Sequence, residues 1–366
     1  MKILHYAPDL QGGGADLLAA DLAFALQVFD VQSTLVAPAN AQVSITPSTL
    51  LRHVRYSSHH LFGQWGLARK LRGLIVSRTP DIVQAYGYNA IITASKICNS
   101  LPSNRRPKLV GVLSGYPPGG DILRSPEILG CDALTVVAKH LRQHLSGAAE
   151  AYEKAWVIPY GVNETLCHPG YKPSTEWQES WKRTHPELSD RFVVCLPGPI
   201  SAMHGSADVV PMVSTLLQQD IQAHILIAGD SAKADPEFIT TLRRRMRSAG
   251  IEQHFTWVDA PKQLRDIMCS CHAVINLATS PEAYNRPMLE ALALGRPVVG
   301  YDHGVAGEYL EAFQPVGTVP VGDFDAVADV LSQWHSYPPD PVESIPYPYR
   351  LSDTAKSYYD LYTSLT

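Results

Sequence analysis

Residues 274–302 read VINLATSPEAYNRPMLEALALGRPVVGYD, which is the most informative stretch of the chain. It begins and ends with short apolar runs, 274-VINLA-278 and 298-VVGYD-302, which are typical of buried strands. Between them lies 282-EAYNRPMLE-290, which leads into an apolar segment of helical length. The order is strand, loop, helix, turn, strand, which indicates a parallel α/β unit.

The predicted helix covers residues 287–294. Pro287 suits a first helical position, because its φ is already helical and a missing N–H costs nothing there. Gly295 is suited to the left-handed conformation that ends a helix, and Pro297 prevents the helix from continuing. Both ends of this short helix are therefore fixed by the sequence.

Two carboxylates accompany the helix. Glu282 is expected in the preceding loop and Glu290 in the first helical turn. A helix N-terminus carries unpaired N–H groups and partial positive charge, which favour a phosphate. Carboxylates accept hydrogen bonds from hydroxyl groups, such as those of a ribose or hexose. Phosphate donors beside hydroxyl acceptors suggest a sugar nucleotide as ligand.

Length and composition fit an enzyme with two domains. A chain of 366 residues exceeds one ordinary core, and 45% apolar residues support two well-formed ones. No apolar run approaches the roughly 20 residues that span a bilayer. The N-terminal MKILHYAPDLQGGG predicts a strand and a turn, and not a signal peptide.

The six cysteines are scattered without a disulfide framework. Cys269 and Cys271 form a CxC motif without a second cysteine pair, so no zinc site is expected there. We therefore expect a reduced, cytoplasmic protein.

The net charge of −5 conceals an asymmetry. Residues 1–165 hold 15 Lys and Arg against 11 Asp and Glu, whereas residues 166–366 hold 15 against 24. Two interpretations of the basic N-terminal half are possible. Its charges are ordinary solvated surface, or they form a face that binds an anionic acceptor or lipid headgroups, with peripheral contact to the inner face of the membrane.

No nucleic-acid motif is present. The run 243-RRRMR-247 suits a helix C-terminus, and no function is assigned to it.

Short apolar strands alternate with helical segments along the chain, which predicts doubly wound parallel sheets. The irregular segment 163–190 contains Pro169, Pro173 and Pro186 and is expected to connect two domains. The predicted parts are an acceptor domain at 1–165, a nucleotide-sugar domain at 166–340, and a bend and helix at 341–366 that returns to the first domain.

The chain resembles the family-four retaining glycosyltransferases, which consist of two Rossmann-like domains with a donor cleft between them, the GT-B fold. The segments that carry the resemblance are 12-GGGAD-16, 135-TVVAKHLRQHL-145, 156-WVIPYGVN-163, 225-ILIAGD-230 and 282-EAYNRPMLEALALGRPVVGYDHGVAGE-308.

The resemblance implies a donor site in the second domain. Glu282 is placed beside the donor sugar as the catalytic residue, and Glu290 on the nucleotide ribose. The donor diphosphate is held at the helix start and approached by the glycine turn. The residues assigned to it are Gly13, Gly14, His204, Asn285, Arg286, Met288 and Leu289.

The resemblance also implies an acceptor site formed by Asp16, Ser114 and Tyr116. This sequence departs from the family pattern at 198-GPISAMHG-205. There Pro199 and His204 replace the Arg and Lys that usually contact the diphosphate. Arg286 is the cation that compensates for part of this loss of positive charge.

Two functions remain open at this point. The first is sugar transfer from a nucleoside-diphosphate sugar to a glycan or lipid-linked acceptor, with retention of configuration, in polysaccharide or glycolipid synthesis. The second is a catalytically degenerate relative that acts as a binding or partner subunit. No cofactor or metal is expected, because the motif Asp323-Phe-Asp325 precedes a predicted helix and suits an N-terminal cap. The sequence does not identify the base, sugar or acceptor.

Overall fold

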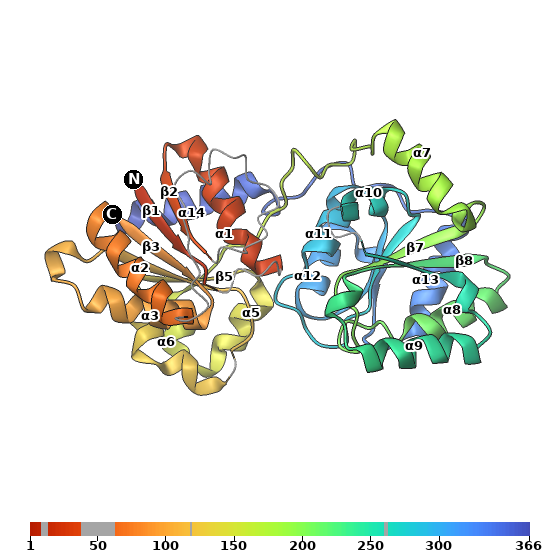
Figure 1. The fold of residues 1–366 in the computed structure, drawn as a ribbon, viewed down its shortest axis with the longest axis horizontal. Helices are drawn as coiled ribbons and strands as arrows, with labels where there is room; N and C mark the ends of the chain where they lie inside the picture. Colours follow the sequence, from red (N-terminus) through yellow and green to blue (C-terminus); the bar gives the residue numbers. More distant parts are fainter. Residues whose placement is uncertain (9–13, 38–62, 118, 260–262) are drawn as a thin grey trace. The chain divides into compact units, whose positions relative to one another are not determined.

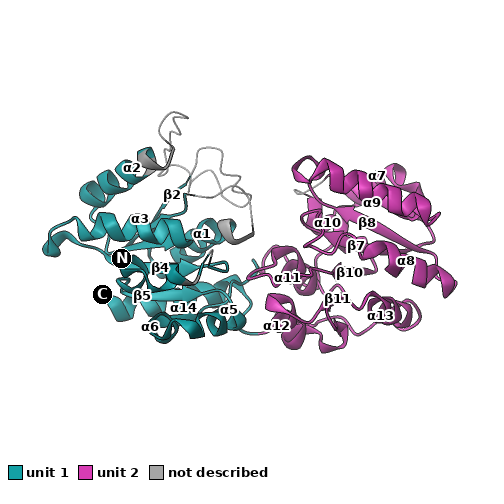
Figure 2. Ribbon diagram, turned by 90° about the horizontal axis from the view of Figure 1, so that it is seen from below, with its two compact units in different colours: residues 1–163, 347–366 teal, residues 164–346 magenta. Residues whose placement is uncertain are grey.

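The computed structural model describes residues 1–8, 14–37, 63–117, 119–259 and 263–366. Of residues 14–16, 63–65, 67 and 120 it describes only the backbone. The chain divides into two compact units, shown in Figure 2. Unit 1 contains Met1–Asn163 and Tyr347–Thr366, and unit 2 contains Glu164–Pro346. Each unit is a parallel sheet covered by helices (Figure 1).

The sheet of unit 1 has six parallel strands in the order β2-β1-β3-β4-β5-β6. The side chains of the four inner strands are buried on both faces, as in β3, where all five residues are buried. This explains why the strands appear in the sequence as continuous apolar runs and not as alternating patterns. The strands are β1 (Lys2–Tyr6), β2 (Gln32–Val36), β3 (Ile82–Tyr86), β4 (Lys108–Leu113), β5 (Ala133–Val136) and β6 (Ala155–Val157).

Helices of unit 1 include the last helix of the chain, α14. Tyr358 of α14 shares a 3.0 Å hydrogen bond with Thr135, and Tyr362 donates a hydrogen bond to Gln84 of β3. These bonds fix the C-terminal segment on the sheet of unit 1. The helices are α1 (Gly14–Ala25), α2 (Gly63–Arg78), α3 (Tyr88–Asn99), α4 (Pro126–Leu129), α5 (Lys139–His144), α6 (Ala149–Lys154) and α14 (Leu351–Leu365).

The sheet of unit 2 also has six parallel strands, in the order β12-β11-β10-β7-β8-β9. The chain first winds outward from β7 through β8 to β9 and then returns to the other side of β7 with β10. The strands are β7 (Phe192–Pro197), β8 (Ala223–Ala228), β9 (Phe255–Val258), β10 (Ala273–Asn276), β11 (Val298–Tyr301) and β12 (Thr318–Val319). The predicted doubly wound α/β class is therefore confirmed.

Both faces of this sheet carry helices, and one apolar core follows the sheet from Phe192 to Trp334. The helices are α7 (Thr175–Thr184), α8 (Val209–Gln218), α9 (Pro236–Ser248), α10 (Leu264–Cys269), α11 (Arg286–Ala293), α12 (Gly304–Phe313) and α13 (Phe324–Ser336). Among the described residues, no helix combines the length and the hydropathy that crossing a membrane requires.

The segment 163–190 differs from its prediction, because it contains α7 instead of being irregular throughout. Ser174 caps the helix by accepting a hydrogen bond from the Trp177 N–H at 3.2 Å. Trp177 and Trp181 stack one turn apart, with ring centroids 5.1 Å from each other. No residue of α7 is buried. A helix with no buried face needs no apolar stripe, and helix prediction from the sequence depends on that stripe.

Three boundaries also differ from the sequence expectation. The predicted strand at 156–162 pairs with β5 only as far as Val157, and Val162 forms an isolated bridge with Arg350 instead. The chain passes from one unit to the other after Asn163 and again after Pro346, whereas the boundaries predicted from the sequence follow residues 165 and 340.

Candidate functional site

The predicted donor residues of unit 2 lie where its sheet changes winding direction. Strands β7 and β10 are parallel neighbours there, and Val274 pairs with Cys195. Their following connections diverge to opposite sides of the sheet, which opens a crevice at the carboxyl edge in folds of this class. The connection after β7 carries His204, and the one after β10 carries Glu282.

These two connections are joined to each other. The Thr279 N–H donates to the Met203 carbonyl at 2.9 Å. Gly205 has a φ of +71°, and a Cβ at this position would lie 1.7 Å from the Leu277 carbonyl oxygen. Glycine is therefore required by both conformation and space. The result is a fixed loop that brings His204 Nε2 to 3.8 Å from Glu282 Oε1.

Glu282 is held from two further directions. Its Oε2 accepts hydrogen bonds from Asn285 Nδ2 at 2.6 Å and from Asn276 Nδ2 at 3.3 Å. Its carbonyl accepts from the Val305 N–H at 2.9 Å, next to the start of α12. About one fifth of the side chain is exposed, so the carboxylate is oriented by the protein but accessible to a ligand.

Helix α11 starts and ends much as the sequence predicts. Asn285 is its N-cap and accepts a hydrogen bond from the Met288 N–H at 2.9 Å. Pro287 lies in the first turn. At the C-terminus Gly295 has a φ of +70°, and its N–H and that of Arg296 donate back into the last turn. This is the glycine-based helix ending predicted from the sequence.

The position of Glu290 differs from the prediction. Because α11 begins at Arg286 and not at Pro287, Glu290 is the fifth helical residue, one residue further along the helix than expected and just past its first turn. There it accepts a hydrogen bond from Arg286 Nε at 2.7 Å, and both side chains are about 15% exposed.

Two of the amide groups predicted to face a phosphate already have partners. The Met288 N–H donates to the Asn285 side chain, and the Leu289 N–H donates to the Asn285 carbonyl at 3.2 Å. A phosphate that used Met288 would have to displace the Asn285 cap. The N–H groups of Asn285 and Arg286 precede these bonds and lie at the open end of the helix.

The predicted residues of unit 1 are only partly described. Gly13 lies outside the described residues, as does Gly12. Gly14 is the first residue of α1, and the side chain of Asp16 is not among the described ones.

Ser114 follows β4 directly, at the carboxyl edge of its sheet. Tyr116 lies two residues later, with its ring centroid 5.1 Å from that of His144 and 5.9 Å from that of His140. Both residues therefore lie on the edge where parallel α/β sheets bind ligands.

The motif around Asp323 is a helix cap, as the sequence predicts. Its carboxylate accepts from the Ala326 N–H at 2.9 Å, and Asp325 accepts from the Thr215 hydroxyl at 2.9 Å. Within the described ranges, no three His, Cys, Asp or Glu side chains gather as a metal site would require.

Two site residues were missed in the sequence analysis. Ser201 shares a 2.7 Å hydrogen bond with Nδ1 of His204, and Asn276 donates to Glu282. Asn276 could have been found, because a polar amide at the end of the buried strand 273-AVIN-276 needs a partner. Ser201 had no comparable signal.

Two buried histidines belong to the cores and not to the site. His5 Nδ1 lies 2.8 Å from the Tyr86 hydroxyl, and burial lowers the pKa of His5 to about 3. In unit 2, His224 Nε2 lies 2.9 Å from the Thr256 hydroxyl, and burial followed by the nearby Arg191 lowers the pKa of His224 to about 4. Both imidazoles are neutral at pH 7.

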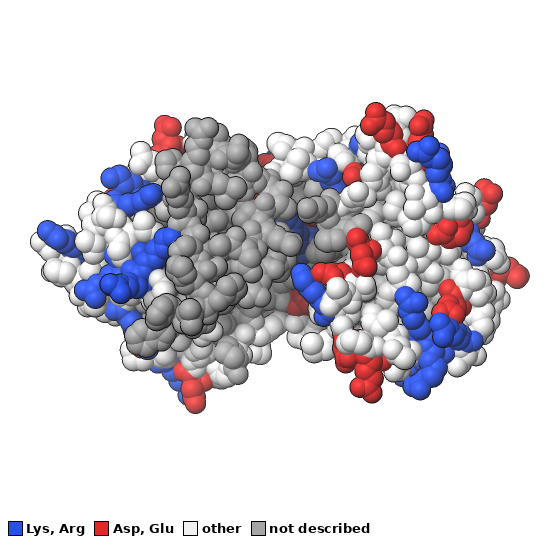
Figure 3. Space-filling model, viewed as in Figure 1, with Lys and Arg blue, Asp and Glu red and all other residues white. Residues whose placement is uncertain are grey.

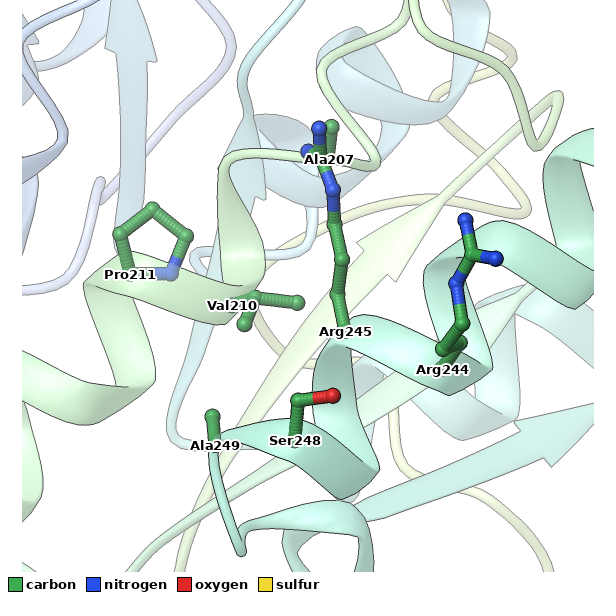
Figure 4. Close-up of a pocket in the computed structure, with 7 residues that line it drawn as sticks. All are labelled: Ala207, Val210, Pro211, Arg244, Arg245, Ser248 and Ala249. Atoms are coloured by element: carbon green, nitrogen blue, oxygen red, sulfur yellow. The ribbon is translucent and has the colours of Figure 1, made fainter.

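A cavity of about 440 Å³ lies elsewhere on unit 2, between the start of α8 and the end of α9. Figure 4 shows Arg244 and Arg245 extending from α9, with Val210 and Pro211 contributed by α8. Lys and Arg side chains also gather over α9 in Figure 3. None of the predicted site residues lines this cavity.

Comparisons with known proteins agree with this fold. Residues 177–347 match the protein family described as glycosyl transferases group 1. No curated protein matches the sequence. The crystal structure of HepE from Anabaena in complex with UDP and glucose superposes with a TM-score of 0.76 at 18% identity, covering 100% of this chain and 97% of that one.

Two further structures resemble the whole chain. A glycosyltransferase from Rickettsia africae has a TM-score of 0.75 at 17% identity, covering 100% of this chain and 98% of its own. Sucrose-phosphate synthase from Thermosynechococcus elongatus has a TM-score of 0.71 at 15% identity, with coverages of 100% and 99%. The chain therefore has the two-domain GT-B fold of these glycosyltransferases, and most of unit 2 matches the family of glycosyl transferases group 1.

Proposed function

We propose that this protein transfers a sugar from a nucleoside-diphosphate sugar to a glycan or lipid-linked acceptor, with retention of configuration, in cell-surface polysaccharide or glycolipid synthesis. The observation that carries the proposal is the cluster of His204, Glu282 and Asn285 at the crevice of unit 2, beside the start of α11. The family match of residues 177–347 and the UDP-bound HepE structure support the same class of donor.

In the proposed donor complex, His204 and Arg286 contact the diphosphate, Glu282 lies beside the donor sugar, and Glu290 accepts the ribose hydroxyls. Each of these two side chains lies near one of these carboxylates: His204 near Glu282, and Arg286 on Glu290. Donor binding then exchanges partners, so that the His204 imidazole and the Arg286 guanidinium turn to phosphate oxygens and the carboxylates turn to hydroxyl groups. The N–H donors needed by the diphosphate are thus held by the same carboxylates that bind the hydroxyl groups of the sugar nucleotide.

The proposed chemistry uses no covalent intermediate. The bond between the sugar C1 and the phosphate oxygen breaks, the acceptor oxygen forms a bond to C1 on the same face, and the acceptor proton passes to the leaving phosphate. Stabilising the charge that develops on the diphosphate carries most of such catalysis. We propose that Gly13 and Gly14 approach the donor, and that Asp16, Ser114 and Tyr116 bind the acceptor.

A screen of UDP-, GDP- and ADP-sugars by thermal shift tests the donor class. We expect one nucleotide series to raise the melting temperature, and its sugar to be transferred with an unchanged anomeric configuration, which NMR of the product reads out. Because cations and N–H groups hold the diphosphate, EDTA should leave binding and transfer intact. Transfer that EDTA abolishes and Mn²⁺ restores would refute the metal-independent mechanism.

Pro199 is the observation that favours the second candidate, a degenerate relative acting as a binding or partner subunit. A proline offers neither a charge nor an N–H to a diphosphate, where the resembling family usually has Arg. Nucleotide binding without transfer, combined with activation of a separate transferase, would support this function. Transfer by the purified chain alone would exclude it.

A further inference from the structure

Ser201 is the first contact of the His204 side chain. Its Oγ lies 2.7 Å from His204 Nδ1 and also accepts a weak hydrogen bond from the His204 main-chain N–H at 3.4 Å. An amide can only donate, so this second bond uses a lone pair of the hydroxyl. The single hydroxyl proton is then free to be donated to Nδ1.

The other ring nitrogen faces a carboxylate. His204 Nε2 lies 3.8 Å from Glu282 Oε1, which is longer than a hydrogen bond, and Nε2 makes no hydrogen bond to any residue that the structure describes. A negatively charged oxygen at this distance attracts an N–H and repels a nitrogen lone pair, so it favours a protonated Nε2. Ser201 on one side and Glu282 on the other therefore favour the same neutral tautomer.

The serine itself is fixed. Its N–H donates to the hydroxyl of Ser206, which is fully buried, at 3.2 Å. The same loop is joined to the connection after β10 through Met203 and by the close approach of Gly205 to Leu277. Because its own position is fixed, Ser201 can fix the position of the His204 imidazole relative to Glu282.

We infer that Ser201 is a positioning residue that holds neutral His204 in the Nε2–H tautomer, so that the ring presents a hydrogen-bond donor to the donor diphosphate. Phosphate oxygens accept hydrogen bonds, and the opposite tautomer would present a lone pair to them. With Ser201 in place, the neutral form of the imidazole presents an N–H, and not a lone pair, to a phosphate. The phosphate contact rests on the proposed function, whereas the tautomer does not.

The tautomer is measured by ¹⁵N NMR of the histidine side chains at pH 8.5, without nucleotide, with His204→Gln used to assign the signal. We expect a protonated Nε2 and an unprotonated Nδ1 in wild type and in Ser201→Thr, which keeps the hydroxyl. Ser201→Ala should shift His204 to a mixture of both tautomers. A protonated Nδ1 in wild type, or an unchanged tautomer in Ser201→Ala, would overturn the inference.

Nucleoside diphosphate affinity gives the second readout. Ser201→Ala should weaken binding about tenfold, as expected for one lost hydrogen bond, and Ser201→Thr should restore it. In a His204→Lys background Ser201→Ala should change nothing, because a lysine has no tautomer to set. Ser214→Ala is the control, since that hydroxyl bonds to the Val210 carbonyl on α8, outside the site.

An equal loss of affinity in both backgrounds would show that Ser201 acts on something other than His204, which contradicts the inference. If wild type keeps the Nε2–H tautomer but binds none of the nucleotides, the proposed function fails, and the phosphate contact inferred for His204 fails with it. The NMR result would then still establish Ser201 as the residue that sets the tautomer.

Discussion

Arg286 and Glu290 form an ion pair one turn apart on α11, with Arg286 Nε 2.7 Å from Glu290 Oε1. The resemblance places these residues on different parts of a sugar nucleotide, the arginine on the diphosphate and the glutamate on the ribose. The ion pair keeps both groups oriented at the start of the helix. Both side chains are mostly buried, and each compensates the charge of the other.

Replacing the carboxylate tests its role in nucleotide binding. Glu290→Gln should leave α11 folded but weaken nucleoside diphosphate binding by about 1.5–3 kcal/mol, the range for a hydrogen bond to a charged group. Calorimetric titration measures this loss, and Glu311→Gln, at an exposed position on α12, is the matched control. A dissociation constant equal to that of wild type would remove Glu290 from the site.

Asn285 has two functions that different substitutions can separate. Asn285→Ala should cost about 1 kcal/mol of unfolding free energy through the lost N-cap, whereas Asn285→Ser should keep most of the cap. Neither variant can donate the 2.6 Å hydrogen bond to Glu282, so both should bind the donor less tightly than wild type. Urea unfolding and calorimetry give the two values. Wild-type affinity in Asn285→Ser would show that Glu282 does not depend on this bond.

Gly205 and Gly250 form a matched pair, because both have a φ of +71°. A Cβ at Gly250 would meet open space, so Gly250→Ala should cost only the left-handed backbone energy of about 1–2 kcal/mol. Gly205→Ala adds the clash with Leu277 and should destabilise unit 2 more and weaken donor binding. Equal unfolding free energies for the two variants, measured in urea, would contradict the close packing of these connections.

The buried histidines predict how stability depends on pH. Their pKa values are depressed in the fold, so the unfolded chain takes up protons near pH 6.5 while the folded chain does not. Stability is then fully present above pH 6.5 and falls as the pH is lowered toward about 3 for His5 and about 4 for His224. Each residue contributes a slope of about 1.4 kcal/mol per pH unit within that window.

His5→Gln should therefore reduce the slope of unfolding free energy against pH between 6.5 and 4.5, and His224→Gln should do the same. Urea titrations of wild type and both variants at several pH values measure these slopes. Parallel slopes in all three proteins would show that these histidines are not the source of the acid sensitivity.

Local features of the site could be predicted from the sequence, but contacts between its loops could not. Pro287 and Gly295 determine the ends of α11 because each has a backbone preference that acts within a few residues. The proximity of His204 to Glu282 depends instead on β10 lying beside β7. Nothing in the order of strands along the chain specifies that neighbour.

The same distinction explains why α7 and Ser201 were missed. Helix α7 has no buried face, and its stacked tryptophans replace the apolar stripe on which helix prediction depends. Ser201 matters only through the fold of a loop in which Gly205 approaches Leu277. Such a loop is set by tertiary packing and carries no periodic pattern.

The crevice of unit 2 should bind a nucleoside diphosphate through His204. The most direct measurement is calorimetric titration of UDP, GDP and ADP into wild type, His204→Ala and His204→Lys at pH 8. We expect one nucleotide to bind wild type, to bind His204→Ala less tightly, and to bind His204→Lys more tightly, because a lysine supplies a permanent charge to the diphosphate. Equal affinity in all three proteins, or binding of no nucleotide to wild type, would contradict the account.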